Sequence, residues 1–172
     1  MLFRSGQSIL ELPNEVGKLL HLRYLKLSCI KIEELPESIC NLCNLQSLDI
    51  SECSVLDKLP QGIGKLINLR HLLFIEDVDE IRIKSFPKGI GRLTCLKTLQ
   101  YFPVGKGEET CKLGESKHLN HIQGKLQIVG LSNVVDFGVI ENTLKKKKDL
   151  RYLGLVFNTL EEMKDKFEKE EE

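Results

Sequence analysis

The sequence predicts an α/β repeat solenoid, a horseshoe with parallel β-strands on its concave face and irregular or short helical segments on its convex side. The first observation is a recurring hydrophobic phrase, written "LRYLKL", "LQSLDI", "LRHLLF", "LKTLQY" and "LRYLGL" along the chain. The second is a Leu-Pro or Phe-Pro pair that recurs with it and places Pro13, Pro36, Pro60 and Pro87 at one point of the unit. Residue types that recur at a fixed period have a structural role first.

The period of the repeat identifies its type. The middle leucine of each phrase stands at Leu25, Leu48, Leu72, Leu99 and Leu153, and a weaker copy, "LQI", supplies Leu126. Successive spacings are 23, 24, 27, 27 and 27 residues, within the range of about 20–29 residues typical of leucine-rich repeats. One such unit cannot bury its own leucines, so about three or more must stack. The sequence therefore predicts about six stacked units.

Each phrase predicts a strand with one face in the core, because its last two apolar residues are two apart. Their side chains are expected to point inward: Leu25 and Leu27, Leu48 and Ile50, Leu72 and Phe74, Leu99 and Tyr101, Leu126 and Ile128, Leu153 and Leu155. Residues between and beside them should face outward as a continuous grid on the concave sheet. The predicted protein-binding residues are Tyr24, Lys26, Ser28, Ser47, Asp49, Ser51, His71, Leu73, Ile75, Thr98, Gln100, Phe102, Lys125, Gln127, Val129, Tyr152 and Val156, with Gly154 between the last two.

This predicted grid is polar in its first two units and apolar at several later positions, namely Leu73, Ile75, Phe102, Val129 and Val156. Exposed apolar patches on a protein surface mark interaction sites. Either a separate partner or another part of the parent protein would cover such a patch, and both mean contact with protein.

The return segments "PESICNL" and "PQGIGKL" are too short and too rich in small residues for a long helix. They predict a short helical turn or irregular backbone, with Ile39, Leu42, Ile63 and Leu66 turned inward. Cys40 occupies the position of the small residues Gly64 and Gly91, so we interpret it as structural. Cys53 follows its strand at a position where leucine-rich repeats carry Asn or Cys.

The 172 residues divide into one solenoid, residues 1–160, and a charged tail, residues 161–172. The first unit is expected to be incomplete, because "SILELPNEVGKL" is the second half of a repeat without its strand. Residues 103–124 are expected to form a loop insert, onto which Leu113, Leu119 and Ile122 could still dock. Formal net charge is zero, which gives no general case for nucleic acid. No secretory signal or apolar run of spanning length is present, so a cytoplasmic protein without a membrane span is expected.

No motif in the chain predicts catalysis, a metal or a cofactor. Cys40-Asn-Leu-Cys43 has the spacing of half a zinc site, but no second pair accompanies it. Lys65 and Lys106 follow glycines, yet neither stands in the Gly-x-x-x-x-Gly-Lys-Ser/Thr pattern of a phosphate loop. The run Lys145–Lys148 is expected to be a solvated face, with a nucleic-acid or import patch as its alternative.

The chain resembles the leucine-rich-repeat region of plant intracellular disease-resistance proteins that carry a coiled coil and a nucleotide-binding module. The phrases that carry the resemblance are "LRYLKLSCIKIEELPESICNLCNLQSLDISEC", "LPQGIGKLINLRHL", "FPKGIGRLTCLKTLQYFPVG" and "GKLQIVGLSNVVD", from residue 8 to residue 157. The resemblance implies recognition of a pathogen effector or a guarded host protein, and autoinhibition of the nucleotide-binding module. That module lies outside these residues, so no cofactor is carried over.

Two other functions compete with this one. Repeats of the "LP..I..L" style also occur in generic intracellular scaffolds of signalling complexes. A truncated product without an autonomous function is the second alternative. A nucleotide-binding module encoded in frame upstream would favour the receptor over the scaffold.

Overall fold

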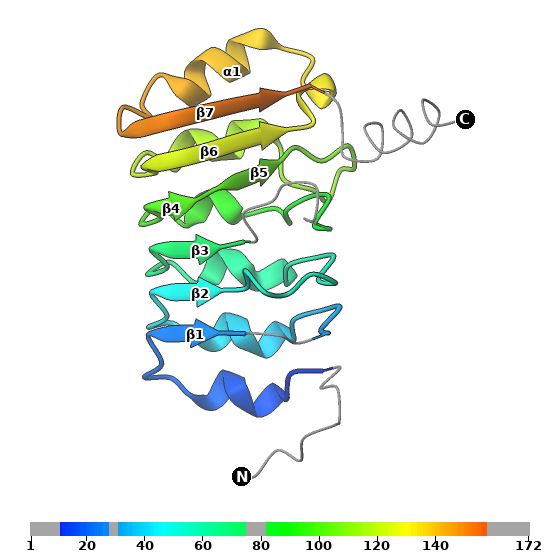
Figure 1. The fold of residues 1–172 in the computed structure, drawn as a ribbon, viewed down its shortest axis with the longest axis vertical. Coiled ribbons are helices and arrows are strands. Elements are labelled where there is room, and N and C mark those ends of the chain that lie inside the picture. Colours follow the sequence, from blue (N-terminus) through cyan, green and yellow to red (C-terminus); the bar gives the residue numbers. More distant parts are fainter. Residues whose placement is uncertain (1–10, 28–30, 75–81, 158–172) are drawn as a thin grey trace, which may run out of the picture.

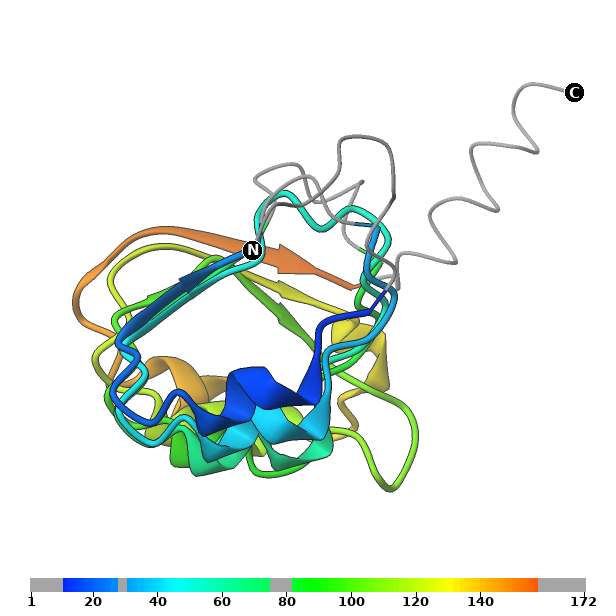
Figure 2. The same cartoon turned by 90° about the horizontal axis from the view of Figure 1, so that it is seen from below.

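A computed structural model describes residues 11–27, 31–74 and 82–157, and in it the repeats stack into a solenoid (Figure 1). Figure 2, which looks along the stack, shows strands on one side of the coil and short helices on the opposite side. The predicted α/β repeat solenoid is therefore confirmed. Ser28, Ile75 and the charged tail 161–172 lie outside the described residues.

The strands lie at the predicted phrases and pair in parallel. A four-stranded sheet has the order β1 (Tyr24–Lys26), β2 (Ser47–Asp49), β3 (His71–Leu73), β4 (Thr98–Leu99). A three-stranded sheet has the order β5 (Tyr101–Pro103), β6 (Gly124–Val129), β7 (Leu150–Val156). In the first sheet Leu25, Leu48, Leu72 and Leu99 are register partners, so the repeat period sets the pairing.

Short helices carry the chain over the convex side. They are η1 (Asn14–Lys18), η2 (Glu37–Asn41), η3 (Gln61–Lys65), η5 (Ile90–Arg92), η6 (Leu113–His118) and η7 (Leu131–Asn133), all 3-10 helices, and α1 (Phe137–Leu144), an α-helix. A proline precedes η1, η2 and η3, where the missing N–H of proline costs no helical hydrogen bond. The short helical turns predicted for "PESICNL" and "PQGIGKL" are confirmed.

The core is a continuous column of leucine and isoleucine between sheet and helices. The inward strand residues from Leu27 to Ile128 are buried, and so are Ile39, Leu42, Ile63 and Leu66 from the helices. Leu25 at the first strand is half-buried. Leu153 and Leu155 of β7 remain 38% and 41% exposed, because no described unit stacks on their far side.

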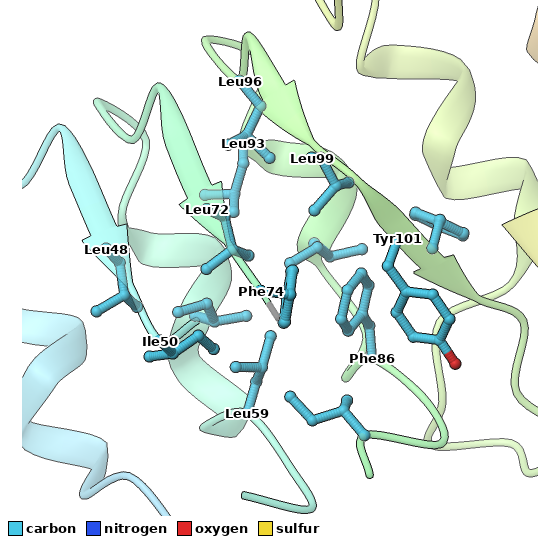
Figure 3. Close-up of a cluster of buried hydrophobic side chains, with 14 of the residues drawn as sticks. Leu48, Ile50, Leu59, Leu72, Phe74, Phe86, Leu93, Leu96, Leu99 and Tyr101 are labelled. Carbon is cyan, nitrogen blue, oxygen red and sulfur yellow. The ribbon is translucent and has the colours of Figure 1, made fainter. Parts of the chain in front are cut away.

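An aromatic cluster replaces leucines near the middle of this column. Phe74 stacks on Phe86 with ring centroids 5.7 Å apart, and Tyr101 meets Phe86 edge-on at 6.5 Å (Figure 3). Phe102 packs edge-on against Phe86 at 5.6 Å. Such aromatic pairs contribute to stability beyond their buried area.

In the first units, side chains also donate hydrogen bonds to the backbone of the neighbouring unit. Asn44 donates to the carbonyl of Leu20, and Asn68 donates to the carbonyl of Cys43, both at 2.8 Å. The Cys53 thiol donates to the carbonyl of Leu27 at 3.4 Å. The two asparagine bonds recur at the repeat period. The bond from Cys53 satisfies a carbonyl group of the preceding unit, which fits the structural interpretation of Cys53.

The convex helices approach so closely that small residues are required at their contacts. A Cβ added to Gly64 would lie 2.4 Å from the carbonyl oxygen of Gly89, and one added to Gly91 would lie 2.5 Å from that of Glu115. Cys40, at the equivalent position of η2, is buried. Its structural role as a small residue is therefore consistent with the packing.

Two segments differ from what the sequence predicts. The insert 103–124 contains η6 and buries Leu113, Leu119 and Ile122, so most of it is an ordinary convex segment, with residues 106–109 exposed. In the basic run, Lys145, Lys146 and Lys148 are exposed as expected, but Lys147 is 5% exposed and donates to the carbonyl of Ser116 at 2.6 Å. The helix α1, with Asp136 capping the N–H of Gly138 at 2.8 Å, was not predicted.

Candidate protein-binding surface

The outward side chains of β1 to β4 form the surface that the sequence predicts for partner binding. Tyr24 pairs in register with Ser47, which pairs with His71, which pairs with Thr98. Because side chains in register lie on the same side of a parallel sheet, these four residues form one row. Lys26, Asp49 and Leu73 form a second row.

Asp49 is the centre of a polar cluster that spans the first two strands. Its carboxylate accepts hydrogen bonds from the Ser51 hydroxyl at 2.6 Å and the Ser51 N–H at 3.1 Å. The Tyr24 hydroxyl donates to the other carboxylate oxygen at 3.3 Å, and the Lys26 ammonium lies 3.8 Å from it. Lys26 also contacts Glu52 at 3.1 Å. We call this group, Tyr24, Lys26, Asp49, Ser51 and Glu52, the Asp49 cluster.

These contacts set the protonation states of the cluster. Partial burial acts to raise the pKa of the Asp49 carboxyl, but the hydrogen bonds from Ser51 and the charge of Lys26 outweigh it and hold that pKa below its usual value. The hydrogen bond and negative charge of Glu52, together with the charge of Asp49, raise the pKa of Lys26. The cluster therefore keeps an anion and a cation fixed side by side, with Tyr24 54% exposed above them.

A second polar contact lies on the same face two strands away. The Nδ1 atom of His71 and the Thr98 hydroxyl are 3.0 Å apart. Both side chains are half-buried, as is Leu73. The two rows thus change along the sheet, from an ion pair in the Asp49 cluster to the polar contact between His71 and Thr98.

On the second sheet the outward face consists of Lys125, Gln127 and Tyr152. The Lys125 ammonium lies 5.5 Å from the centroid of the Tyr152 ring, a cation–π contact. Gly154 must be small here, since a Cβ would lie 2.7 Å from the Cγ atom of Gln127. Lys125 and Tyr152 are exposed, while Gln127, Gly154 and Val156 are half-buried.

The predicted apolar part of the grid is wrong at Phe102 and Val129. Phe102 is buried in the aromatic cluster, and Val129 is buried where β6 runs beside Pro103 and Val104. The physical reason for Phe102 is register. Leu99 and Leu126 are 27 residues apart, but Tyr101 pairs with Gln127, 26 residues further on, and Phe102 pairs with the core residue Ile128. All three residues of β5 are buried, and Tyr101 and Phe102 both pack edge-on against Phe86.

Three other predicted residues are only partly available to a partner. Ser47 and Asp49 are mostly covered by their neighbours. Gln100 lies between β4 and β5, where the two sheets separate, and its Oε1 atom is buried with no hydrogen-bond partner among the described residues. The side chains that do extend from the described concave face are therefore Tyr24, Lys26, Lys125 and Tyr152, with His71, Leu73 and Thr98 half-buried among them.

The two cysteines of the Cys40-Asn-Leu-Cys43 motif lie in different environments. Cys40 is buried beneath η3 and Cys43 is exposed. Burial, then the charge of Glu37, raises the pKa of the Cys40 thiol to about 11. Burial likewise raises the pKa of Cys53 to about 11. Both thiols are therefore poor nucleophiles near neutral pH.

The described residues include no helix that is both long and apolar enough to cross a membrane.

Comparison with solved structures identifies the fold. An LRR protein of Leptospira interrogans superposes with a TM-score of 0.52 at 21% identity, over 88% of this chain and 41% of that one. The LRR ectodomain of the Arabidopsis thaliana membrane receptor kinase GASSHO1/SCHENGEN3 superposes with a TM-score of 0.57, also at 21% identity, over 86% of this chain and 17% of that one. At this identity the likeness shows the fold alone.

Proteins related in sequence identify the family as well as the fold. The disease-resistance candidate RGA4 of Solanum bulbocastanum is 41% identical over 166 residues, covering 83% of this chain and 16% of RGA4. The TMV resistance protein N of Nicotiana glutinosa is 34% identical over 164 residues, covering 92% of this chain and 13% of N. The chain thus spans only a small part of each relative. The model of a leucine-rich repeat region matches residues 8–135, and the chain belongs to this leucine-rich repeat family, with plant disease-resistance proteins as its relatives.

Proposed function

We propose that this chain is a protein-interaction module of a plant intracellular immune receptor, acting in the cytoplasm in effector recognition and in autoinhibition. The observation that carries the proposal is the ordered row of outward side chains on β1 to β4, from the Asp49 cluster to the His71–Thr98 contact. The exposed side chains of Tyr24 and Lys26 are held in place by contacts with Asp49. Groups held in this way suit recognition of a protein surface, because little side-chain entropy is lost on binding.

The partners that fit this proposal are a pathogen effector, a guarded host protein or the nucleotide-binding module of the parent receptor. The kinship with disease-resistance proteins supports all three. Paired charges at Asp49 and Lys26 favour specificity over bulk affinity. Tyr24 and Tyr152 supply the large, exposed aromatic surface that is enriched at interface hot spots.

The test is binding in trans. Residues 1–172 are mixed with the nucleotide-binding module of the parent receptor, and affinity is measured by biolayer interferometry. The double variant Tyr24→Ala/His71→Ala should weaken binding by about tenfold or more, in line with the loss of one hot-spot aromatic. The matched control Lys18→Ala/Lys65→Ala changes exposed residues of the convex helices η1 and η3 and should bind like the parent chain.

Circular dichroism of both variants confirms that the fold is kept. A result in which the convex variant loses binding, while the concave variant retains it, contradicts the proposed surface. The same pair of variants, tested in the full-length receptor, distinguishes the two roles. Loss of autoinhibition should produce defence signalling in the absence of a pathogen. Loss of recognition should abolish defence signalling when the pathogen is present.

A further inference from the structure

The turns that lead from the convex helices into the strands share one backbone conformation. The residues that end these helices have φ between −74° and −83° and ψ between 54° and 65°; they are Leu19, Leu42, Leu66, Leu93 and Leu119. At Leu20, Cys43 and Ile67 the N–H then donates to the carbonyl two residues earlier, at 2.8 to 3.0 Å. Equivalent residues therefore lie in columns along one edge of the solenoid, where the strands begin (Figure 1).

One of these columns lies directly before the strands and is rich in cations. The N–H of Gln46 donates to the carbonyl of Arg23 at 2.8 Å, and that of Arg70 donates to the carbonyl of Gln46 at 2.8 Å. The N–H of Lys97 donates to the carbonyl of Arg70 at 2.7 Å. Neighbouring strands are about 4.8 Å apart, so Arg23 and Arg70 are about 10 Å apart along the edge.

A second column of cations lies in the last turns of the convex helices, at Lys18, Lys65 and Arg92. The turns 18–24, 41–47, 65–71, 92–98 and 118–124 contain six lysines or arginines and no aspartate or glutamate, although the whole chain has a formal net charge of zero. We call the six cations the basic edge: Lys18, Arg23, Lys65, Arg70, Arg92 and Lys97.

The charge of the basic edge is not neutralised within the chain. All six side chains are exposed. None of them forms an ion pair with a residue that the structure describes. The same edge continues at the last strand, where Lys145, Lys146 and Lys148 are exposed just before β7. An uncompensated surface of this kind attracts a partner of opposite charge.

An apolar column lies between the two columns of cations. Leu20 follows Lys18 and precedes Arg23 in the first turn, and it is 50% exposed. Ile67, at the equivalent place, is 52% exposed, and Cys43 between them is also exposed. The bonds from Asn44 and Asn68 to the carbonyls of Leu20 and Cys43 hold the turns together. Exposed apolar side chains that are grouped in this way mark an interaction site.

This pattern specifies the shape of the partner. A narrow apolar strip with cations on both sides matches a helix that has one apolar stripe with acidic residues on both sides of it. Seven residues of an α-helix rise about 10.5 Å, close to the length of about two strand spacings from Leu20 to Ile67. The apolar column has no aromatic ring on which the bases of a single-stranded nucleic acid could stack. It is one residue wide, which suits a helix better than the plane of a bilayer.

We propose that the basic edge binds an acidic amphipathic α-helix of a second protein. The apolar stripe of that helix packs on Leu20, Cys43 and Ile67. Its carboxylates pair with Lys18 and Lys65 on one side and with the two arginines of the strand column on the other. This surface is separate from the concave row, so the proposal goes beyond the proposed function, and the chain can hold two partners at once.

The probe is the alanine-based peptide acetyl-AQALEAELAQLEAELAQA-amide, which has leucines on one stripe of a helix and glutamates on both sides of it. It is added to ¹⁵N-labelled chain 1–172 and followed by NMR. We expect saturable shifts of the amides of Leu20, Cys43 and Ile67, with a Kd of about 0.1–1 mM, and no shift of Gly105. The same peptide with glutamine in place of every glutamate should bind about tenfold more weakly, because several ion pairs are lost together.

Salt should act on the two peptides differently. Exposed charges are screened as ionic strength rises. Between about 50 mM and about 500 mM NaCl, we expect binding of the glutamate peptide to weaken by about tenfold. Binding of the glutamine peptide should change little, because only its apolar contact remains.

Charge variants locate the contact on the basic edge. Lys18→Ala/Lys65→Ala and Arg23→Gln/Arg70→Gln each remove two cations from one column, and each should weaken binding of the glutamate peptide by about threefold or more. The matched control Lys58→Ala/Lys88→Ala also removes two exposed lysines. Those lysines lie just before η3 and η5, at the far ends of these helices from the basic edge, and this control should bind like the parent chain.

A third substitution tests the apolar column. Ile67→Ser should weaken binding of both peptides, because both carry the leucine stripe. Val135→Ser is its control, since Val135 is 97% exposed and lies outside the turns of the basic edge, and it should leave binding unchanged. Circular dichroism of each variant checks that the fold is kept.

Three outcomes overturn the proposal. Equal binding of the glutamate and glutamine peptides shows that charge does not select the partner. Full binding of the glutamate peptide to Lys18→Ala/Lys65→Ala and to Arg23→Gln/Arg70→Gln places the contact elsewhere. Tighter binding of oligouridylate, or of vesicles that contain phosphatidylserine, than of the glutamate peptide assigns the edge to a nucleic acid or to a membrane.

The proposed function fails or holds independently of this result. Tyr24→Ala/His71→Ala should weaken binding of the nucleotide-binding module and keep binding of the glutamate peptide. Lys18→Ala/Lys65→Ala should do the reverse. If the peptide does not bind while Tyr24→Ala/His71→Ala still weakens binding of the module, the concave surface stands and the proposal for the basic edge is wrong.

Discussion

At the scale of single residues, small side chains at the convex contacts decide whether neighbouring units can stack. Gly64→Ala would place a methyl group 2.4 Å from the carbonyl oxygen of Gly89, a backbone atom that cannot turn aside. We expect a loss of about 1–3 kcal/mol in the free energy of unfolding, the usual cost of overpacking. Urea denaturation measures it.

Gly114→Ala is the matched control, because its added methyl group would meet only Val139 at an ordinary 3.9 Å. We expect its free energy of unfolding to stay unchanged or to rise by about 0.4–1 kcal/mol, because alanine reduces the conformational freedom of the unfolded chain. Equal destabilisation by the two substitutions would show that the close approach of η3 and Gly89 does not limit stacking.

The buried ammonium of Lys147 makes stability depend on pH. Burial lowers its pKa to about 8, whereas an unfolded lysine titrates near about 10.4. Between these values the unfolded chain binds more protons than the folded chain, so this group contributes stability that rises with pH. The buried thiols of Cys40 and Cys53 act in the opposite direction, since their pKa values are raised in the fold.

Substitution of Lys147 separates its effect on the pH dependence of stability from that of the buried thiols. Denaturation of the parent chain and Lys147→Gln at about pH 7 and about pH 9.5 should show a larger gain with pH for the parent chain. Lys146→Gln, which changes an exposed neighbour, should keep the parent slope. If the free energy of unfolding changes equally with pH in the parent chain and in Lys147→Gln, the Lys147 ammonium is solvated in the folded protein.

At the scale of elements, acidic side chains cap helices of neighbouring units. The Glu37 carboxylate accepts from the N–H groups of Gln61 and Gly62 at 2.5 and 3.1 Å, at the start of η3. Glu115 does the same for Gly89 and Gly91, at 2.7 and 3.4 Å, beside η5. These helices have no side-chain cap of their own, so the cap comes from the adjacent repeat.

Glu37→Ala should therefore cost about 0.5–2 kcal/mol in the free energy of unfolding, the range for loss of an N-cap. Glu34→Ala removes only an exposed ion pair with Lys58, and exposed pairs contribute about 0–1 kcal/mol. Thermal or urea unfolding of the two variants compares them directly. A larger loss for Glu34→Ala would mean that the bonds to Gln61 and Gly62 do not hold η3 in place.

The same elements show what the sequence can predict. Strand positions and the inward leucines follow from the period, because one leucine phrase per unit leaves a single way to pair Leu25, Leu48, Leu72 and Leu99. The break at Gln100 could not be predicted, since the spacing of Leu99 and Leu126 gives 27 while the register gives 26. That one-residue difference moved Phe102 into the core.

Contacts between units are harder still to predict, because their partners lie a whole repeat apart. Asp49 and Ser51 are two residues apart, and this spacing is a local signal for part of the Asp49 cluster. Nothing local in the sequence links Lys147 to Ser116, although the two are joined by a hydrogen bond in the fold. The candidate surface was therefore predicted as a set of strand positions, while the contacts across strands in the Asp49 cluster required the fold.

At the scale of the whole molecule, β7 is the last described strand of the solenoid, and its inward leucines Leu153 and Leu155 are 38% and 41% exposed. Leu153 and Leu155 are register partners of Leu126 and Ile128, which are 1% and 0% exposed. In the described part of the chain no strand pairs with the outer edge of β7. An edge strand with exposed apolar residues is a template for pairing with another chain, so we expect concentration-dependent self-association of residues 1–172.

Leu153→Gln/Leu155→Gln should reduce this self-association in sedimentation velocity and cost less than about 1 kcal/mol of stability, because both side chains already contact water. Leu126→Gln changes the equivalent residue inside the stack, where an unpaired amide would replace a buried leucine, and should unfold the chain or cost about 2–5 kcal/mol. Self-association that persists unchanged in the double variant would place the contact elsewhere than β7. A double variant that unfolds like Leu126→Gln would show that Leu153 and Leu155 are covered in solution, so the end of the stack would be closed rather than open.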